Sequence, residues 1–354
     1  MTSMLHVDRV SKFFGPIMAL NNVSFDVGEG EIVGFLGPNG AGKSTMMRIL
    51  TTYLPATQGI AKVAGYDVMT ESMEVRQNIG YLPESVPLYG EMRVEEYLMY
   101  RAKLKGVSRR ERPSRLEKVL AQCRVKEVRR RQIGTLSKGY RQRVGLADAM
   151  IHDPPILILD EPTAGLDPIQ IRETLRLIKA LGENHTIMLS THILAEVEAI
   201  CERVIIINAG RVSVQQTLEE LETEALTVLE VRGPREQVVK ALQEVKGVTD
   251  VSTSDGDEED EYALFEVQAE EEADLREELF AVILKNQWAL RSLERRRRKL
   301  EDAFFEVIRA DDPLGEYVSE RVPGQKGDMG IQDLERDASK TTESEEEDEE
   351  TKAD

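Results

Sequence analysis

Residues 37–45 read Gly-Pro-Asn-Gly-Ala-Gly-Lys-Ser-Thr, directly after a largely apolar run at 31–36. This spacing of glycines, lysine and serine between a buried strand and a helix is typical of a phosphate-binding loop. The glycines permit bends that turn backbone N–H groups toward an anion, and the helix predicted from Lys43 to about Tyr53 points its positive dipole end at the same place. The motif predicts a nucleoside triphosphate site with these contacts: Gly37, Pro38, Asn39, Gly40, Ala41, Gly42, Lys43, Ser44 and Thr45.

Two side chains of this loop have distinct expected roles. Lys43 is long enough to reach the β- and γ-phosphates, and Ser44 offers a hydroxyl to Mg²⁺. The alternative is a glycine-rich turn that carries a solvated lysine. The β-rich run before the loop and the helical pattern after it favour the phosphate site.

Two adjacent carboxylates, Asp160 and Glu161, end a second apolar run at 156–159. Neighbouring side chains on a strand point to opposite faces, but the chain turns at the strand's end, so two acids there can act near one phosphate. We expect Asp160 to bind Mg²⁺, directly or through water. Glu161 suits the base that orients and deprotonates an attacking water.

Short apolar runs alternate with helical patterns as far as about residue 220. Since strands that are apolar throughout and separated by helices are typical of a parallel sheet covered on both faces, we predict an α/β fold with its function at the carboxyl ends of the strands. The predicted strands are 32–36, 79–82, 156–160, 186–190 and 203–207, and the predicted helices are 43–53, 93–105, 113–123, 138–151, 168–182 and 193–200.

From about residue 225 the pattern predicts strand, helix, two strands, helix and strand, the βαββαβ order of a small ferredoxin-like α+β unit. We therefore expect three parts: residues 1–222 with a helical subdomain at about 85–150, an accessory domain at 223–310, and a tail at 311–354. Five consecutive bases at 295–299 end the βαββαβ pattern. We interpret them as a solvated helix face, with contact to a protein or lipid headgroup as the alternative. A nucleic-acid site is disfavoured because no aromatic residues interleave the bases.

The net charge of −19 is concentrated in two segments of the 354-residue chain. Segment 255–274 holds eleven acidic and no basic residues, and segment 328–354 holds twelve acidic and three basic residues. Residues 341–354 lack apolar residues that could offset the entropy of ordering, so we predict a disordered tail, with a docking tail as the alternative. No apolar run approaches a membrane span and the first residues do not resemble a signal segment, so we expect a cytosolic chain.

Five further motifs follow in order. They are the aromatic Phe14 in Lys-Phe-Phe-Gly, the stretch Gly-Tyr-Leu-Pro-Glu ending at Glu84, Leu-Ser-Lys-Gly-Tyr at 136–140, Pro-Thr-Ala-Gly-Leu-Asp at 162–167, and Ser-Thr-His ending at His192. With the phosphate loop and the paired acids, they resemble the nucleotide-binding subunit of an ATP-binding-cassette (ABC) transporter. The resemblance covers about residues 4–212.

The resemblance implies a P-loop NTPase of the ABC type that hydrolyses ATP with Mg²⁺. Phe14 would stack on adenine, and His192 would hold the γ-phosphate and the water in line. Ser137 and Gly139, at a helix N-terminus, would contact ATP bound by a second copy of the chain, so the subunit would work as a dimer, most simply a homodimer. The implied catalytic residues are Glu161, His192 and Lys43, and the implied metal ligands are Ser44, Glu84 and Asp160.

Three residues depart from the usual family pattern: Lys138 replaces a glycine, Tyr140 replaces a glutamine in the same segment, and Glu84 replaces another glutamine. The lysine, the Glu84 variant and the Leu-Glu-Asp-Ala-Phe-Phe segment at 300–305 are similar to type-2 ABC exporters and their gliding-motility-type relatives. The resemblance therefore implies export through separate membrane permease subunits, at the cytoplasmic face of the membrane and without nucleic acid. Residues 86–100 would form the permease's docking groove, with Tyr89 and Met92 as candidates, although an ordinary core explains them equally well.

Two other classes remain as alternatives. A soluble ABC ATPase that acts on nucleic acid or ribosomes usually has two cassettes or a coiled-coil insertion, and neither pattern is present. A regulatory protein that binds ATP without hydrolysing it would lack the base or the switch histidine, but Glu161 and His192 are both present.

Overall fold

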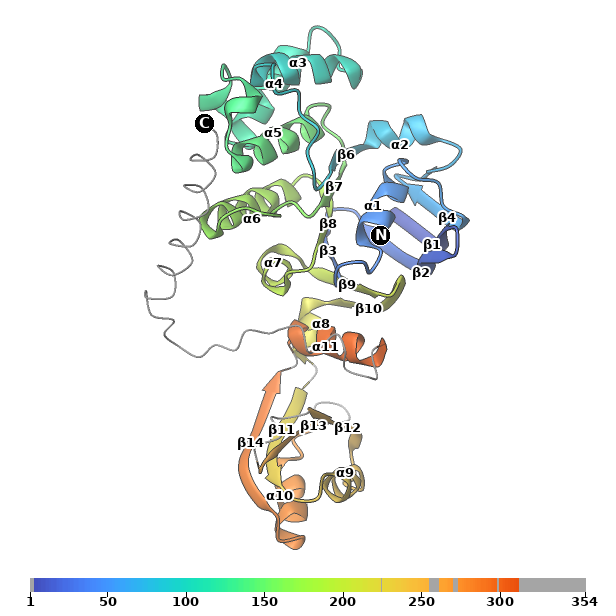
Figure 1. The fold of residues 1–354 in the computed structure, drawn as a ribbon, viewed down its shortest axis with the longest axis vertical. Coiled ribbons are helices and arrows are strands. Elements are labelled where there is room, and N and C mark those ends of the chain that lie inside the picture. Colours follow the sequence, from blue (N-terminus) through green and yellow to red (C-terminus); the bar gives the residue numbers. More distant parts are fainter. Residues whose placement is uncertain (1–2, 224, 255–260, 270–272, 298, 312–354) are drawn as a thin grey trace, which may run out of the picture. The chain divides into compact units, whose positions relative to one another are not determined.

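The structure is a computed structural model that describes residues 3–223, 225–254, 261–269, 273–297 and 299–311 (Figure 1). The tail predicted at 311–354 lies outside the described residues apart from its first position, and so do residues 255–260 and 270–272 of the acidic segment. Disorder of the tail therefore stays a prediction.

A six-stranded sheet forms the centre of the fold, and its strand order is β10-β9-β3-β8-β7-β6. The pairs from β9 through β6 are parallel, and β10 joins the edge antiparallel to β9. The bounds are β3 Ile32–Leu36, β6 Ile79–Leu82, β7 Ile156–Asp160, β8 Thr186–Thr191, β9 Arg203–Asn208 and β10 Arg211–Thr217. The predicted parallel sheet is confirmed, and its five predicted strands agree with the observed bounds to within one residue.

Successive side chains of the central strands enter two different cores. Leu157 and Leu159 of β7 pack with the larger group of helices, whereas Ile156 and Ile158 pack with α1 and the antiparallel sheet on the opposite face. Figure 1 shows α5, α6 and α7 on one side of the sheet and α1 on the other. Because both faces are covered, every residue of β7 is buried, which explains its uninterrupted apolar run.

The helices of this part agree closely with the prediction. They are α1 Lys43–Leu50, α2 Ser72–Asn78, α3 Val94–Leu104, α4 Arg112–Gln122, α5 Lys138–Met150, α6 Pro168–Gly182, α7 Leu194–Ile200 and α8 Leu218–Thr223. The sequence did not predict α2 or α8, both of which have fewer than eight residues. None of the helices in the described ranges is both long and apolar enough to span a bilayer.

A four-stranded antiparallel sheet in the order β2-β1-β4-β5 was not predicted. Its strands are β1 Ser3–Phe14, β2 Ile17–Gly28, β4 Gln58–Val63 and β5 Tyr66–Asp67. The pairing of β1 with β2 shifts register between Val7 and Val10 and again up to Phe13. Such irregularities break the alternation of apolar and polar residues by which a half-buried strand is recognised in sequence.

A second four-stranded sheet lies between residues 225 and 297 and has the order β12-β13-β11-β14. With its two helices it has the ferredoxin-like topology that was expected. The elements are β11 Ala225–Arg232, α9 Arg235–Gln243, β12 Val248–Ser254, β13 Ala263–Ala269, α10 Arg276–Lys285 and β14 Ala289–Arg297. The bases at 295–297 belong to β14, so their interpretation as a helix face was wrong: the strand extends beyond its predicted end and pairs with β11 up to Arg297.

The last described helix, α11 Leu300–Asp311, packs on the central sheet rather than on the small one. Leu300, Ala303, Phe304 and Val307 are buried in the same cluster as Val197 of α7, together with Ile200, Val204 and Ile206. The division at residues 222 and 310 stays a prediction, and α11 contributes to the core of the first part.

We expect Phe304→Ala to lower the free energy of unfolding by about 3 kcal/mol, because it removes a buried ring and leaves a cavity. Phe305→Ala is the matched control, since Phe305 is only half-buried and lies outside the cluster. Chemical denaturation of the two variants compares them. Equal losses would contradict the packing of α11 on this core.

Candidate active site

The phosphate loop connects β3 to α1, and its backbone requires glycine at two positions in particular. Gly42 precedes the first turn of α1 with φ of 106°, a left-handed conformation. Gly37 lies so close to β9 that a Cβ atom would press into the carbonyl oxygen of Ile207. The loop is thereby held against the sheet while the N-terminus of α1 stays open to an anion.

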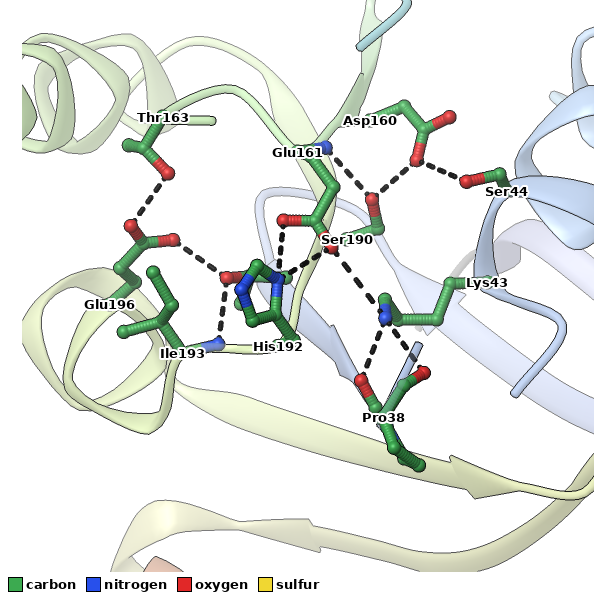
Figure 2. Close-up of polar contacts among 12 residues, drawn as sticks. Pro38, Lys43, Ser44, Asp160, Glu161, Thr163, Ser190, His192, Ile193 and Glu196 are labelled. Atoms are coloured by element: carbon green, nitrogen blue, oxygen red, sulfur yellow. Dashed lines mark hydrogen bonds and ion pairs between the residues drawn. The ribbon is translucent and has the colours of Figure 1, made fainter. Parts of the chain in front are cut away.

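Lys43 is buried at the start of α1, and its ammonium group bridges the loop and the end of β7 (Figure 2). Its Nζ donates to the carbonyl oxygens of Gly37 at 2.7 Å and Pro38 at 3.1 Å, and lies 3.6 Å from Oε1 of Glu161. Burial lowers the pKa of Lys43, and the nearby carboxylates, chiefly Glu161, oppose this shift. Like these carboxylates, an anionic phosphate would favour the charged form of Lys43 and oppose the effect of burial.

Asp160 and Ser44 meet where β7 ends beside α1. Ser44 Oγ donates to Asp160 Oδ1 at 3.2 Å, and Ser190 Oγ at the end of β8 donates to the same oxygen at 2.6 Å. The Ser190 hydroxyl also accepts from the backbone N–H of Glu161 at 2.9 Å. One serine thus ties Asp160, at the end of β7, and Glu161, which follows it, to the neighbouring strand.

Glu161 and His192 contact each other directly. Nδ1 of His192 lies 3.0 Å from Oε2 and 3.2 Å from Oε1 of Glu161. Because a carboxylate only accepts hydrogen bonds, this contact requires the proton on Nδ1. Glu161 has φ of 47°, which is uncommon for a residue with a side chain and is found most often at functional sites.

A cavity of about 320 Å³ opens above the phosphate loop. It is lined by Ala19, Asn39, Gly40, Gly42, Lys43, Ser44, Thr45, Glu84, Glu161, Ala164 and His192. Nine of these residues were predicted from the sequence, and Ala19 and Ala164 were not. Glu161, His192 and Lys43 therefore face one space.

Six of the predicted nucleotide contacts lie outside this lining: Gly37, Pro38 and Ala41 of the loop, and Phe14, Ser137 and Gly139 from elsewhere in the chain. Phe14 is exposed near the end of β1, and Nζ of Lys12 lies 5.1 Å from the centroid of its ring. Ser137 precedes α5 and accepts from Tyr140 N at 3.4 Å, which makes it the cap of that helix. Gly139 is buried in the first turn of α5. The structure does not bring Ser137 and Gly139 to the phosphate loop of their own chain.

The oxygen groups beside Lys43 fit Mg²⁺. Ser44 Oγ and Asp160 Oδ1 are 3.2 Å apart; Ser44 and Glu84 line the cavity above the phosphate loop, whereas Asp160 is not part of that lining. Hydroxyl and carboxylate oxygens are hard ligands, the kind that Mg²⁺ takes together with water and phosphate oxygens.

A second and larger cavity, of about 930 Å³, lies beside the first. Glu84 lines both cavities. The apolar side chains of Tyr53, Met73 and Leu104 are exposed at this second cavity, together with Arg48 and Arg76. Tyr89 and Met92, the residues that the sequence suggested for a docking groove, do not line it. The ring of Tyr89 instead meets that of Tyr97 edge to face, and Met92 packs against the core.

Sequence reasoning missed two sets of polar residues at the site. Ser190 is one, and its signal was a hydroxyl at the end of an otherwise apolar strand. The other is Glu196 with Thr163 and Thr191, whose side chains are joined by hydrogen bonds. The signal in the sequence was an acid on the same helical face as Val197 and Ile200, the other buried residues of α7.

Comparison with known proteins gives consistent results. The family model described as "ABC transporter" matches residues 20–164. The ATP-binding protein NatA of Bacillus subtilis is 40% identical over 209 residues, which are 58% of this chain and 84% of NatA. The linearmycin resistance ATP-binding protein LnrL of the same organism is 32% identical, covering 70% of this chain and 82% of LnrL. The solved dimeric cassette MJ0796 is 28% identical with a TM-score of 0.56, over 61% of this chain and 99% of MJ0796.

We expect Lys43→Ala to weaken binding of a non-hydrolysable ATP analogue about a hundredfold, because each charged hydrogen bond lost to phosphate contributes roughly 1.5–3 kcal/mol. Isothermal titration calorimetry measures the affinity. Lys62→Ala, an exposed lysine of β4, is the control. Unchanged affinity of the Lys43 variant would exclude this loop as the phosphate site.

Proposed function

The chain belongs to the ABC transporter ATP-binding proteins, and on that premise we propose that two copies of it drive a type-2 exporter related to the gliding-motility group. ATP hydrolysis coupled to transport is the activity of the family, and this chain is accordingly an ATPase. The proposal adds the roles of individual residues, Mg²⁺, the pairing of two copies, and the permease partner. The observation that carries it is the contact of Glu161 with both His192 and Lys43 at one cavity.

In the proposed reaction, Glu161 takes a proton from the water whose oxygen attacks the γ-phosphorus. The bond from that phosphorus to the bridging oxygen breaks, and the electron pair leaves with ADP. His192 donates through Nδ1 to Glu161 and so holds the carboxylate toward the cavity. Lys43 neutralises charge on the β- and γ-phosphates. Bound Mg²⁺, held by Ser44 and Asp160 with Glu84 nearby, would supply further positive charge there.

The proposed dimer follows from the position of Ser137 and Gly139. Ser137 and Gly139 stand at the N-terminus of α5, outside the cavity of their own chain. The Ser137 hydroxyl accepts from Tyr140 N as the cap of α5, and its own hydrogen can still be donated to a phosphate at this helix N-terminus. Contact with ATP on a second copy would use this feature, and the relative MJ0796 is described as dimeric.

Export through separate permeases is supported by three features. LnrL is named for resistance to linearmycin, a role that fits removal of a compound from the cell. Lys138 and Glu84 match the exporter-type variants of the motifs. The larger cavity has exposed Tyr53, Met73 and Leu104 and so offers an apolar binding site for a permease segment. Because Glu84 lines this cavity and the nucleotide cavity, a segment bound there would be coupled to the state of the nucleotide. We place the complex at the cytoplasmic face of the membrane.

We expect Glu161→Gln to reduce ATP turnover at least a hundredfold while the protein still dimerises with ATP, because the amide keeps the shape of the carboxylate but cannot take the proton. Adding Ser137→Ala to this variant should abolish dimerisation and leave ATP binding by the single chain intact. Size-exclusion chromatography with and without ATP measures dimerisation. Adding Ser114→Ala, an exposed serine of α4, is the control. Residual turnover near wild type would exclude Glu161 as the base.

We expect Leu104→Glu to reduce the fraction of the chain that sediments with membranes from its own host by at least fivefold, because a charge would enter the apolar part of the larger cavity. ATPase activity of the isolated protein should not change. Ile60→Glu is the matched control, since Ile60 is an exposed apolar residue of β4 outside this cavity. Undiminished sedimentation of the Leu104 variant would contradict docking at this surface.

A further inference from the structure

Glu196 is a buried acid that the reaction above does not use. It lies in the first turn of α7, four positions after His192, and only 2% of its surface is exposed. It does not line the nucleotide cavity. A carboxylate removed from water in this way is costly unless its oxygens receive strong hydrogen bonds.

Both carboxylate oxygens of Glu196 accept a hydroxyl hydrogen (Figure 2). Thr163 Oγ1 donates to Oε1 at 2.6 Å, and Thr191 Oγ1 donates to Oε2 at 2.7 Å. Both threonines are themselves buried. The two hydroxyls come from different segments of the chain, because Thr163 follows β7 and Thr191 ends β8.

The chemistry of the carboxylate fixes the direction of these hydrogen bonds. A carboxylate can only accept, so both threonine hydroxyls must donate to it. The lone pairs of Thr191 Oγ1 are then free to accept from the backbone N–H of Ile193 at 3.0 Å. The chain of bonds from Ile193 through Thr191 to Glu196 thus orients the backbone on both sides of His192.

The same bonds reach the candidate base. Thr163 is two residues beyond Glu161, and the turn between them is closed by the hydrogen bond from Ala164 N to Glu161 O at 3.1 Å. Glu196 therefore links the segment that carries Glu161 to the segment that carries His192. The side chains of Glu161 and His192 contact each other at 3.0 Å, and Ser190 also joins the two segments by accepting from the backbone N–H of Glu161 at 2.9 Å.

We propose that Glu196 is a positioning residue for hydrolysis, which holds Glu161 and His192 in register through Thr163 and Thr191. The inference rests on the proposed function, because it assumes that Glu161 and His192 act on ATP. It assigns a role to a residue that touches neither nucleotide nor metal. A displacement of reacting groups by about 1 Å can cost roughly a hundredfold in rate, so loss of this link should appear in turnover rather than in binding.

The first test is Glu196→Gln in the full-length chain. The amide nitrogen would donate where the carboxylate accepted, so one threonine hydroxyl must turn away. We expect kcat to fall between about tenfold and a hundredfold while the affinity for a non-hydrolysable ATP analogue stays within about twofold of wild type. Glu198→Gln, an exposed acid of the same helix, should change neither quantity. Unchanged kcat, or an equal loss of affinity and kcat, would overturn the proposal.

A second pair of variants decides the matter if Glu196→Gln does not fold. Thr163→Val removes the hydroxyl and keeps the shape, whereas Thr163→Ser keeps the hydroxyl. We expect a loss of kcat for valine and recovery for serine, and equal kcat values for the two would overturn the proposal.

A third measurement separates this inference from the proposed function. In a His192→Ala background, Glu196→Gln should reduce single-turnover hydrolysis by less than it does in the wild type, because residues of one network are not additive. An equal loss in both backgrounds would contradict action through His192. Failure of the proposed function itself would appear separately, as residual turnover of Glu161→Gln.

Discussion

The parallel pairing of β3, β8 and β7 is the constraint on which the rest of the site depends. Leu36 at the end of β3 pairs with Thr191 of β8, and Asp160 at the end of β7 pairs with Ser190. Three segments that are far apart in the sequence therefore end at the same level of one sheet. The phosphate loop, Glu161 and His192 each follow one of these strands, so the sheet register brings them together.

Hydroxyl groups donate to the carboxylates of Asp160 and Glu196, and the buried cation Lys43 lies beside Glu161. Ser190 and Ser44 donate to Asp160, and Thr163 and Thr191 donate to Glu196. Lys43 has its pKa lowered by burial and carries the positive charge nearest to Glu161. Hydroxyls orient a carboxylate without cancelling its charge, so the Asp160 carboxylate keeps the negative charge that a metal ion would require.

Much of this arrangement could be predicted because it depends on local spacing. The apolar strands and the loop between β3 and α1 are recognisable from contiguous residues, and nine of the residues around the cavity were foreseen. Contacts between distant segments could not be foreseen in the same way. The contacts of Ser190 with Asp160 and of Glu196 with Thr163 form only once β8 and α7 have folded beside β7. The antiparallel sheet was missed because the irregular pairing of β1 disturbs the alternation of its side chains.

The packing of α11 has a consequence for how the chain is made. Leu300, Phe304 and the other buried residues of α11 complete a core whose remaining members lie before residue 222. The ribosome synthesises the whole small sheet, residues 225–297, after those members and before α11. During synthesis, the apolar surface on α7 and β9 of the ATP-binding part would stay exposed until the small sheet and then α11 have emerged from the ribosome. The small sheet is thus an insertion in the folding order as well as in the sequence, and a chain cut before α11 would expose that surface to other proteins.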